Sequence, residues 1–447
     1  MKKATFLASA LLGASIFVAG CSEETHTDHE PAMEQEMDEN MNEEMENEGM
    51  DHDDMDHDQM DSDDSTEDAH QSHNNQGGKT DYADEPHSFN EAATEQLLVS
   101  NTKNITRLNE DNPITLSIHV SQMIWPSTHE ENQPGTVILA PVNNWQYSLA
   151  ALTLVHHPND GPILYYDEEI NDDVLDELNR LNPKGNNEGI EVLAVGELSE
   201  SERSKLTAFE VKTINENNPA AFAQMVEEEF SKTIDTVEEA VIIGSMEDSA
   251  KEYTLTAANW ISHMNESLLY VNSDTIPEET KEALAQREGS AKIYVLGPEK
   301  VINQTVVSEL EEYGDVVRIE GENAVSQSIE MASFKDTETG FGWGITEPGH
   351  GLVFASTASP ELAIAAAPFA HLGKHAPMIW LDEGELTQDL FNYLAQIKPE
   401  FQEDPTEGPY NHGYLIGTFD TISFNTQGIL DEKLEIVSAD GDGHGQH

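Results

Sequence analysis

Beyond residue 86 the chain repeats itself at a period of about 105 residues, and this repetition restricts the possible fold more than any other feature. One junction motif occurs three times, with Asn112, Asn218 and Asn323 at matching positions 106 and 105 residues apart. Each copy is long enough to hold a small core of its own. The boundaries drawn from this motif are repeat 1 at 86–215, repeat 2 at 216–321, repeat 3 at 322–437 and a flexible C-terminus at 438–447.

All three repeats show the same order of segments. An apolar strand leads into an alanine-rich helix, a second apolar strand, an acidic helix and a third strand that ends on glycine, at Gly196, Gly297 and Gly417. Short, continuous apolar runs predict strands that are buried on both faces, as in a parallel sheet. Their alternation with helices predicts right-handed crossovers and a three-layer α/β arrangement. The glycine-rich stretch from Gly340 to Gly351 reads as a connection between a helix and a sheet.

This threefold pattern resembles the cell-wall-binding repeat type 2 family of Gram-positive surface proteins. The resemblance covers roughly residues 97–437 and includes the PILYYD strand at Pro162 and the VVRIEG junction at Val316, which is similar to the family's R-I-x-G. It implies three flavodoxin-like parallel-sheet units in a pseudo-threefold arrangement. It also implies non-covalent attachment to an anionic cell-wall polymer such as a teichoic-acid-like glycan.

The chain departs from the family pattern after the junction glycine, where the family carries an Asp-Arg pair. Here those positions read Asn112-Pro113, Asn218-Pro219 and Asn323-Ala324. The missing arginines matter because arginine is the natural bidentate partner of phosphate. Binding of an anionic polymer would therefore need screening salt, bridging divalent cations or backbone amides at helix N-termini.

Ligands of parallel sheets bind beyond the carboxyl ends of the strands. The turns after the first strand of each repeat are therefore the candidate ligand-binding positions, and the alternative is that these residues only cap the following helix. The candidates are Asn143, Asn144 and Trp145 in repeat 1, Ser245, Glu247 and Asp248 in repeat 2, and Ser356, Thr357 and Ser359 in repeat 3.

The charge of the chain is strongly negative, with 87 acidic residues against 21 Lys plus Arg and a net charge of −66. Residues 22–85 hold 25 of the acids, which leaves 62 acids against 18 bases and a net charge of −44 beyond residue 85. Such a surface repels nucleic acid and anionic lipid. Nucleic acid is therefore not expected as a partner, whereas a solvated acidic surface suits an exported protein.

The N-terminus has the pattern of an export signal. Lys2 and Lys3 precede an apolar run, Ala4 to Val18, that is too short to span a bilayer, and the run ends in VAGC at Cys21. This tetrad resembles a bacterial lipobox. It predicts a signal peptide at 1–20 and lipidation of Cys21, with the protein anchored on the outer face of the cell membrane and extending into the cell-wall space. The alternative is an ordinary secretory signal that ends near a cysteine.

Residues 21–85 are rich in Asp, Glu, Met and His and poor in large apolar side chains, so we expect a disordered spacer. Thioether and imidazole groups suit copper, and carboxylates suit calcium. The segment therefore has two interpretations, a solvated tether or a metal-binding tail on which the protein would act as a copper- or calcium-binding lipoprotein. The candidate metal ligands are Met50, His52, Met55, His57 and Met60.

Enzymatic motifs are absent from the sequence. No dinucleotide fingerprint, Walker motif or Gly-x-Ser-x-Gly elbow occurs, and Cys21 is the only cysteine, so we expect no enzyme, no required cofactor and no disulfide. The histidines His156-His157, His371 and His375 are conceivable metal ligands. His371 and His375 follow the alanine-rich helix of repeat 3 at a helical spacing, and we expect them to complement the helix dipole instead.

Overall fold

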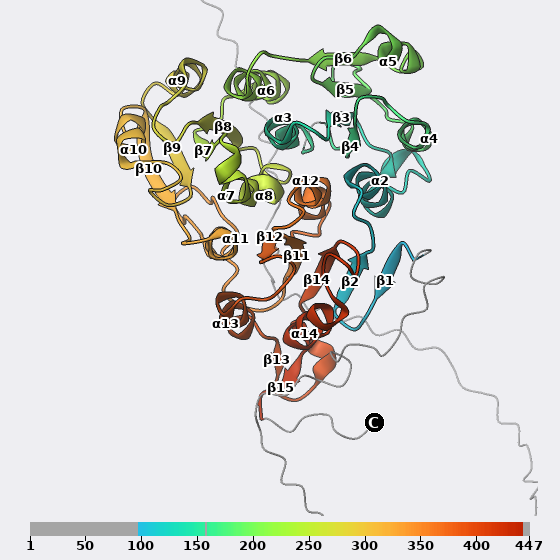
Figure 1. The fold of residues 1–447 in the computed structure, drawn as a ribbon, viewed down its shortest axis with the longest axis vertical. Coiled ribbons are helices and arrows are strands. Elements are labelled where there is room, and N and C mark those ends of the chain that lie inside the picture. Colours follow the sequence, from blue (N-terminus) through green and yellow to red (C-terminus); the bar gives the residue numbers. More distant parts are fainter. Residues whose placement is uncertain (1–96, 157–158, 441–447) are drawn as a thin grey trace, which may run out of the picture. The chain divides into compact units, whose positions relative to one another are not determined.

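The computed structural model describes residues 97–156 and 159–440, which form three large, mainly parallel sheets with flanking helices (Figure 1). The predicted α/β class with repeated flavodoxin-like units is confirmed. In each of these three sheets the first strand of the repeat is central, the second strand lies on one side, and the third and fourth lie on the other. None of the helices in the described part of the chain is long and apolar enough to cross a membrane.

Sheet 1 has the order β4-β3-β5-β6, and all its strand pairs are parallel. Strands β3, β4 and β5 are apolar and almost entirely buried, as in parallel sheets covered by helices on both faces, whereas β6 is partly exposed. The elements are β3 (Val137–Pro141), α3 (Trp145–Ala151), η3 (Leu152–Leu154), β4 (Ile163–Tyr166), α4 (Asp172–Leu181), β5 (Val192–Val195), α5 (Glu200–Lys205) and β6 (Val211–Ile214).

Sheet 2 repeats this topology in the order β8-β7-β9-β10. Its first helix is broken into short α and 3-10 turns. The elements are β7 (Ala240–Ser245), η4 (Asp248–Ala250), α7 (Lys251–Thr254), η5 (Leu255–Ala257), α8 (Ala258–Ile261), β8 (Ser267–Val271), α9 (Glu278–Ala285), β9 (Ala291–Leu296), α10 (Gln304–Leu310) and β10 (Gly314–Ile319).

Sheet 3 takes its fourth strand from the other end of the folded region. Its order is β12-β11-β14-β2-β1, in which β2 is parallel to β14 and β1 is antiparallel to β2. The elements are β1 (Val99–Asn101), β2 (Ile105–Leu108), β11 (Gly351–Ser356), α12 (Glu361–Ala366), η6 (Ala367–Ala370), β12 (Met378–Leu381), α13 (Gln388–Gln396), β14 (His412–Ile416) and α14 (Phe424–Leu434).

The placement of β2 differs from the boundary drawn at residue 86, which assigns this strand to repeat 1. Strand β2 corresponds in sequence to β6 and β10, the last strands of sheets 1 and 2, so it supplies the last strand that repeat 3 itself lacks. Arg107 of β2 donates to the carbonyl of Gly417 (2.8 Å), just as Arg318 of β10 donates to that of Gly297 (2.7 Å). The two arginines therefore show the same contact at equivalent places in sheets 3 and 2.

Three junction helices follow the last strands: α2 (Pro113–Ile124), α6 (Pro219–Ile234) and α11 (Ala324–Ser333). The aligned asparagines Asn112, Asn218 and Asn323 are their N-caps, and each accepts hydrogen bonds from backbone amides of the first turn. Pro113 and Pro219 stand at the first helical position, where proline is favoured. The junction motif is therefore a helix start signal.

Each junction helix packs on the second strand of its own repeat and on the first helix of the preceding repeat. Helix α6 packs on β8 and α3, α11 packs on β12 and α7, and α2 packs on β4 and on α12 of repeat 3. At the α3–α6 contact the rings of Tyr147 and Phe222 stack with centroids 4.2 Å apart. Because the contact of α2 with α12 has the same form as the other two, the three repeats close into a cycle, as the pseudo-threefold arrangement requires.

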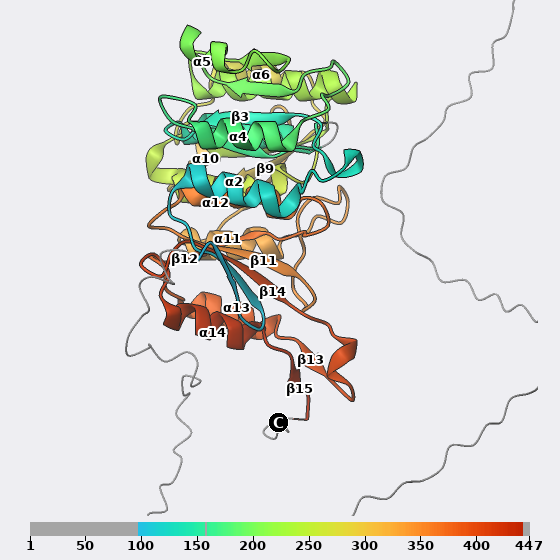
Figure 2. The same ribbon diagram turned by 90° about the vertical axis from the view of Figure 1, so that its right-hand side faces the viewer.

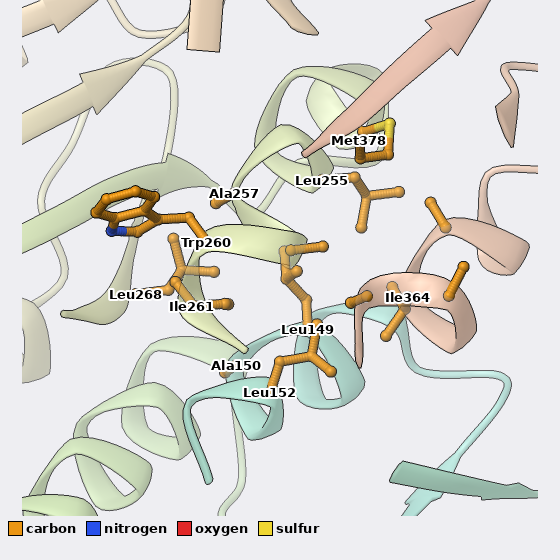
Figure 3. Close-up of a cluster of buried hydrophobic side chains, with 14 of the residues drawn as sticks. Leu149, Ala150, Leu152, Leu255, Ala257, Trp260, Ile261, Leu268, Ile364 and Met378 are labelled. Carbon is orange, nitrogen blue, oxygen red and sulfur yellow. The ribbon is translucent and has the colours of Figure 1, made fainter. Parts of the chain in front are cut away.

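The first helices of the three repeats meet at the centre of this cycle. Helix α12 contacts both α3 and α8, and α8 also contacts η3 and η6 (Figure 1). Alanines such as Ala150 and Ala257 are fully buried there, and their small side chains allow the helices to approach closely. Figure 3 shows side chains of all three repeats in one apolar cluster, among them Leu149, Leu255 and Ile364.

A small addition to the fold lies near the C-terminal end, close to α13 and α14 (Figure 2). Strand β13 (Glu400–Phe401) pairs in parallel with β15 (Val437–Ser438). Ser438, which the sequence boundary places in a flexible C-terminus, thus lies in a strand. Residues 441–447 are outside the described part.

Candidate functional site

The candidate positions of repeat 1 start the first helix of that repeat. Asn143 is exposed in the turn after β3, and Asn144 caps α3 by accepting from the amide of Tyr147 (3.2 Å). Trp145 is buried, and its indole N–H donates to Asp248 of repeat 2 (2.9 Å). The structure therefore brings two predicted positions together across a boundary between repeats.

The candidate positions of repeats 2 and 3 are used mainly in local turns. Ser245 and Ser356 are buried, and their hydroxyls accept from the amides of Glu247 and Ala358. The Glu247 carboxylate accepts from the amide of Ser273 (2.8 Å), and the Thr357 hydroxyl accepts from that of Glu383 (2.8 Å). The remaining position is Ser359, whose amide donates to the carbonyl of Ser356 (3.1 Å).

Two grooves occur at equivalent places in repeats 1 and 3, between the junction helix and the acidic helix. The groove of repeat 1 has a volume of about 360 Å³ and that of repeat 3 about 540 Å³. On the junction helices, Thr115, Ile118, His119 and Gln122 match Ser326, Ile329, Glu330 and Ser333 at a constant offset of 211 residues. On the acidic helices, Asp173, Asp176, Glu177 and Arg180 match Asp389, Asn392, Tyr393 and Gln396 at an offset of 216.

The repeat 1 groove is lined by an ion pair between Glu177 and Arg180. The carboxylate of Glu177 is almost fully buried and accepts from Arg180 Nε (2.7 Å) and from the hydroxyl of Ser121 (2.5 Å). Arg180 also donates to the carbonyls of Trp125 and Pro126, which fixes its guanidinium in place. The groove thus offers carboxylates, amides and one arginine beside apolar surface from Ile118.

The groove of repeat 3 is more acidic. Its lining includes Glu320, Glu322, Glu330 and Asp389, and none of the described residues that line it is basic. Hydroxyl and amide groups from Ser326, Asn392 and Gln396 accompany these carboxylates. A mixture of hydrogen-bonding side chains of this kind suits a polyhydroxylated ligand, and the carboxylates suit a cation.

In repeat 2, side-chain hydrogen bonds link the junction helix α6 and its N-cap to the acidic helix α9. Asn218 donates to Glu279 (3.1 Å), and Gln224 donates weakly to Glu282 (3.4 Å). Arg287 forms an ion pair with Glu227, and both side chains are nearly fully buried. Burial raises the pKa of the Glu227 carboxyl, and the positive charge of Arg287 opposes this rise. The hollow of repeat 2 lies at the end of α6 instead of between α6 and α9, beside Glu228 and Gln286.

The C-terminal ends of the three first helices bring one histidine from each repeat together. His156 follows η3, His263 follows α8 and His371 follows η6, and one ring nitrogen from each lies within 4.8 Å of the others. His371 and His375 do not share a helix face as their spacing suggests, because the helix ends at Ala370 and Gly373 has a positive φ of 79°. His157 is outside the described residues.

Sequence reasoning missed His263 as a member of this group. A signal was present, since His156, His263 and His371 are 107 and 108 residues apart, close to the period of the repeat. Other predicted sites lie outside the described residues, namely Cys21 and the tail ligands Met50, His52, Met55, His57 and Met60.

The fold defines the chain as a protein of three cyclically packed α/β repeats. No protein-family profile and no curated protein sequence matches it. The solved structures that are similar include two proteins from Clostridium difficile. Cwp6 from Clostridium difficile aligns with a TM-score of 0.57 at 15% identity over 73% of this chain and 48% of that one, and Cwp8 from the same organism aligns with 0.57 at 14% over 75% and 52%. At these identities the likeness shows the fold, and the chain spans about half of each neighbour.

Proposed function

We propose that this protein binds the cell wall non-covalently through its three-repeat module, by contact with an anionic wall polymer. The observation that carries the proposal is the fold, which is shared with Cwp6 and Cwp8, two cell-wall proteins, and which agrees with the resemblance of the sequence to the type 2 cell-wall-binding repeat. The grooves of repeats 1 and 3 are the polymer-binding surfaces in this proposal. Their equivalence suits a polymer whose units recur along its length.

The charge of the grooves sets a condition on this binding. Direct contact between an anionic polymer and the carboxylates of the repeat 3 groove is repulsive, and screening by salt weakens this repulsion. A divalent cation such as Ca²⁺ would be held by carboxylates of the protein and by the anionic groups of the polymer together. Polymer binding is therefore expected to increase with Ca²⁺ and with ionic strength, the opposite of the response of a basic polymer-binding protein.

The first test is sedimentation of residues 22–447 with purified cell walls, before and after chemical removal of the anionic polymers. We expect the protein to sediment with intact walls in the presence of Ca²⁺ and to remain in solution when the polymers are gone. Binding that persists after polymer removal would indicate that the protein binds peptidoglycan instead of the anionic polymer. A protein that stays in solution under every condition would contradict wall binding.

Matched variants test the grooves. Asp176 and Asn392 are exposed, equivalent residues that line the two grooves, so Asp176→Trp with Asn392→Trp fills both with bulky side chains. Asn179 and Ala395 are exposed, equivalent positions on the same two helices that do not line the grooves, and their replacement by Trp is the control. We expect wall binding to fall about tenfold or more in the first pair only, a loss of about 1.4 kcal/mol. Equal binding by both pairs would place the contact elsewhere.

Anchoring through a lipid on Cys21 is part of the same proposal. The sequence VAGC supports it, and the expected result is that Cys21→Ser releases the protein from the membrane fraction. The alternative function, copper or calcium binding by the tail, depends on Met50 to Met60 and is tested by titrating residues 22–85 with each metal. Failure of wall binding together with tight binding of copper by that peptide would favour the alternative.

A further inference from the structure

We propose that His156, His263 and His371 form a binding site for a divalent transition metal, with Zn²⁺ as the best fit, where the three repeats meet. Each repeat contributes one histidine from the same place, directly after its first helix. The ligand nitrogens lie within 4.8 Å of one another before any ion is bound. In a tetrahedral zinc site with bonds of about 2.0–2.1 Å, neighbouring ligand nitrogens are about 3.4 Å apart, so small side-chain rotations close the site.

The surroundings of the rings fit metal ligation. A histidine that holds a metal commonly donates its other ring N–H to a carboxylate, which orients the ring and raises its basicity. A ring nitrogen of His371, Nε2, lies 2.9 Å from Asp160 Oδ1 and can donate in this way, which assigns the opposite nitrogen to the metal. His263 Nε2 lies 3.0 Å from His375 Nδ1, and the other nitrogen of His263 is buried without a hydrogen-bond partner among the described residues.

The rings are also held in position by packing. The ring of His263 stacks on Trp343 at 8° between planes, and His371 packs beside Trp125. Trp343 belongs to the glycine-rich connection between α11 and β11, which places it against the histidine of a different repeat. Burial and the neighbouring histidines lower the pKa of His263 to about 3.

The chemistry of the donors selects the class of metal. Neutral imidazoles suit Zn²⁺, Cu²⁺ and Ni²⁺, whereas Ca²⁺ and Mg²⁺ prefer oxygen. Three protein nitrogens leave a fourth position for water, because His375 is exposed and lies at Nε2 of His263, on the side of that ring opposite its unpartnered nitrogen. A metal bound here would join all three repeats at one point and would stabilise the closed cycle.

The test uses the full-length protein after removal of metal with EDTA. Titration with Co²⁺, an optical probe for zinc sites, is expected to give the visible absorption of a tetrahedral site, and Zn²⁺ is expected to displace it and raise the thermal unfolding midpoint. The tail histidines and methionines are present in every variant, so differences between variants report on the central cluster. His263→Gln and His156→Gln should each lose the absorption and the zinc-dependent rise.

Two further variants sharpen the result. Asp160→Asn keeps all three ligands and is expected to weaken metal binding about 10- to 100-fold. His129→Gln removes an exposed histidine that is not part of the cluster and should behave as the wild type. If His263→Gln does not fold, His156→Gln and Asp160→Asn decide the matter. Unchanged cobalt absorption and an unchanged response to zinc in the folded histidine variants would overturn the proposal.

Discussion

At the scale of single residues, equivalent positions keep the same contacts where the surrounding geometry is the same. Arg107 is completely buried, and it donates to the carbonyls of Gly417 and Ile422 and to the side chain of Gln427. Burial lowers its pKa to about 10, and the nearby Asp111 carboxylate opposes this shift. Arg318 makes the same contact to Gly297 but is partly exposed. We therefore expect the contact of Arg107 to contribute more to stability than the contact of Arg318.

This difference gives a prediction for the two arginines. Arg107→Met keeps the apolar stem but leaves buried carbonyl groups without a donor, and we expect a loss of about 3 kcal/mol in the free energy of unfolding. Arg318→Met should cost about 1–2 kcal/mol, because water reaches its partners more readily. Denaturant unfolding of both variants measures the difference. Equal losses would show that burial does not decide the strength of this contact.

At the scale of elements, the alanine-rich helices pack on one another as well as on their own sheets. Small alanine side chains allow a helix to pack closely on its own sheet. In the structure the same helices also contact one another, and Ala257 is fully buried in the shared cluster (Figure 3). Small residues at such a crossing cannot be enlarged without moving a backbone.

Enlarging one of these alanines should therefore be costly. We expect Ala257→Leu to destabilise the protein by about 1–3 kcal/mol through overpacking. Ala285 on α9 is an exposed alanine, and Ala285→Leu should change the free energy of unfolding by less than about 0.5 kcal/mol. Thermal and denaturant unfolding of the pair provide the measurement. A neutral Ala257→Leu would mean that the centre has room for additional atoms.

At the scale of the whole molecule, β2 closes the cycle by joining the two ends of the folded region. Lys103 bonds to Glu435 at 2.7 Å, and the amide of Asn104 donates to Asp431 of α14 at 2.6 Å. In repeat 2 the equivalent helix α10 runs into β10 after a short turn. The end of α14 therefore lies where a direct connection to β2 would continue repeat 3.

A circular permutation tests this description. A chain that starts at Glu110, runs to Leu434 and continues through a short Gly-Ser linker into Lys103–Asn109 has three contiguous repeats. We expect it to fold with an unfolding free energy within about 1 kcal/mol of linear 103–434, because the new ends lie in a loop and the new linker is short. Residues 110–434 alone lack β2 and expose the edge of β14, and they should aggregate or unfold. A stable 110–434 chain would contradict closure by β2.

Local sequence patterns determined the elements of this protein and their order. The apolar strands, the alanine-rich and acidic helices, the strand-ending glycines and the three N-cap asparagines all follow from rules that act within a few residues. The period of about 105 residues then predicted three similar units. These features were accessible because hydrophobic periodicity and capping depend on neighbours in the chain.

Only the tertiary structure decided which distant segments meet. Strand β2 joins sheet 3 because the unpaired edge of β14 needs a partner and residues 105–108 are brought to it by the packing of α2 on α12. The grooves depend on how the junction helix packs beside the acidic helix of its own repeat, and the meeting of His156, His263 and His371 depends on how helices of different repeats pack together. Such contacts link residues that are far apart in the sequence, and no local rule specifies them.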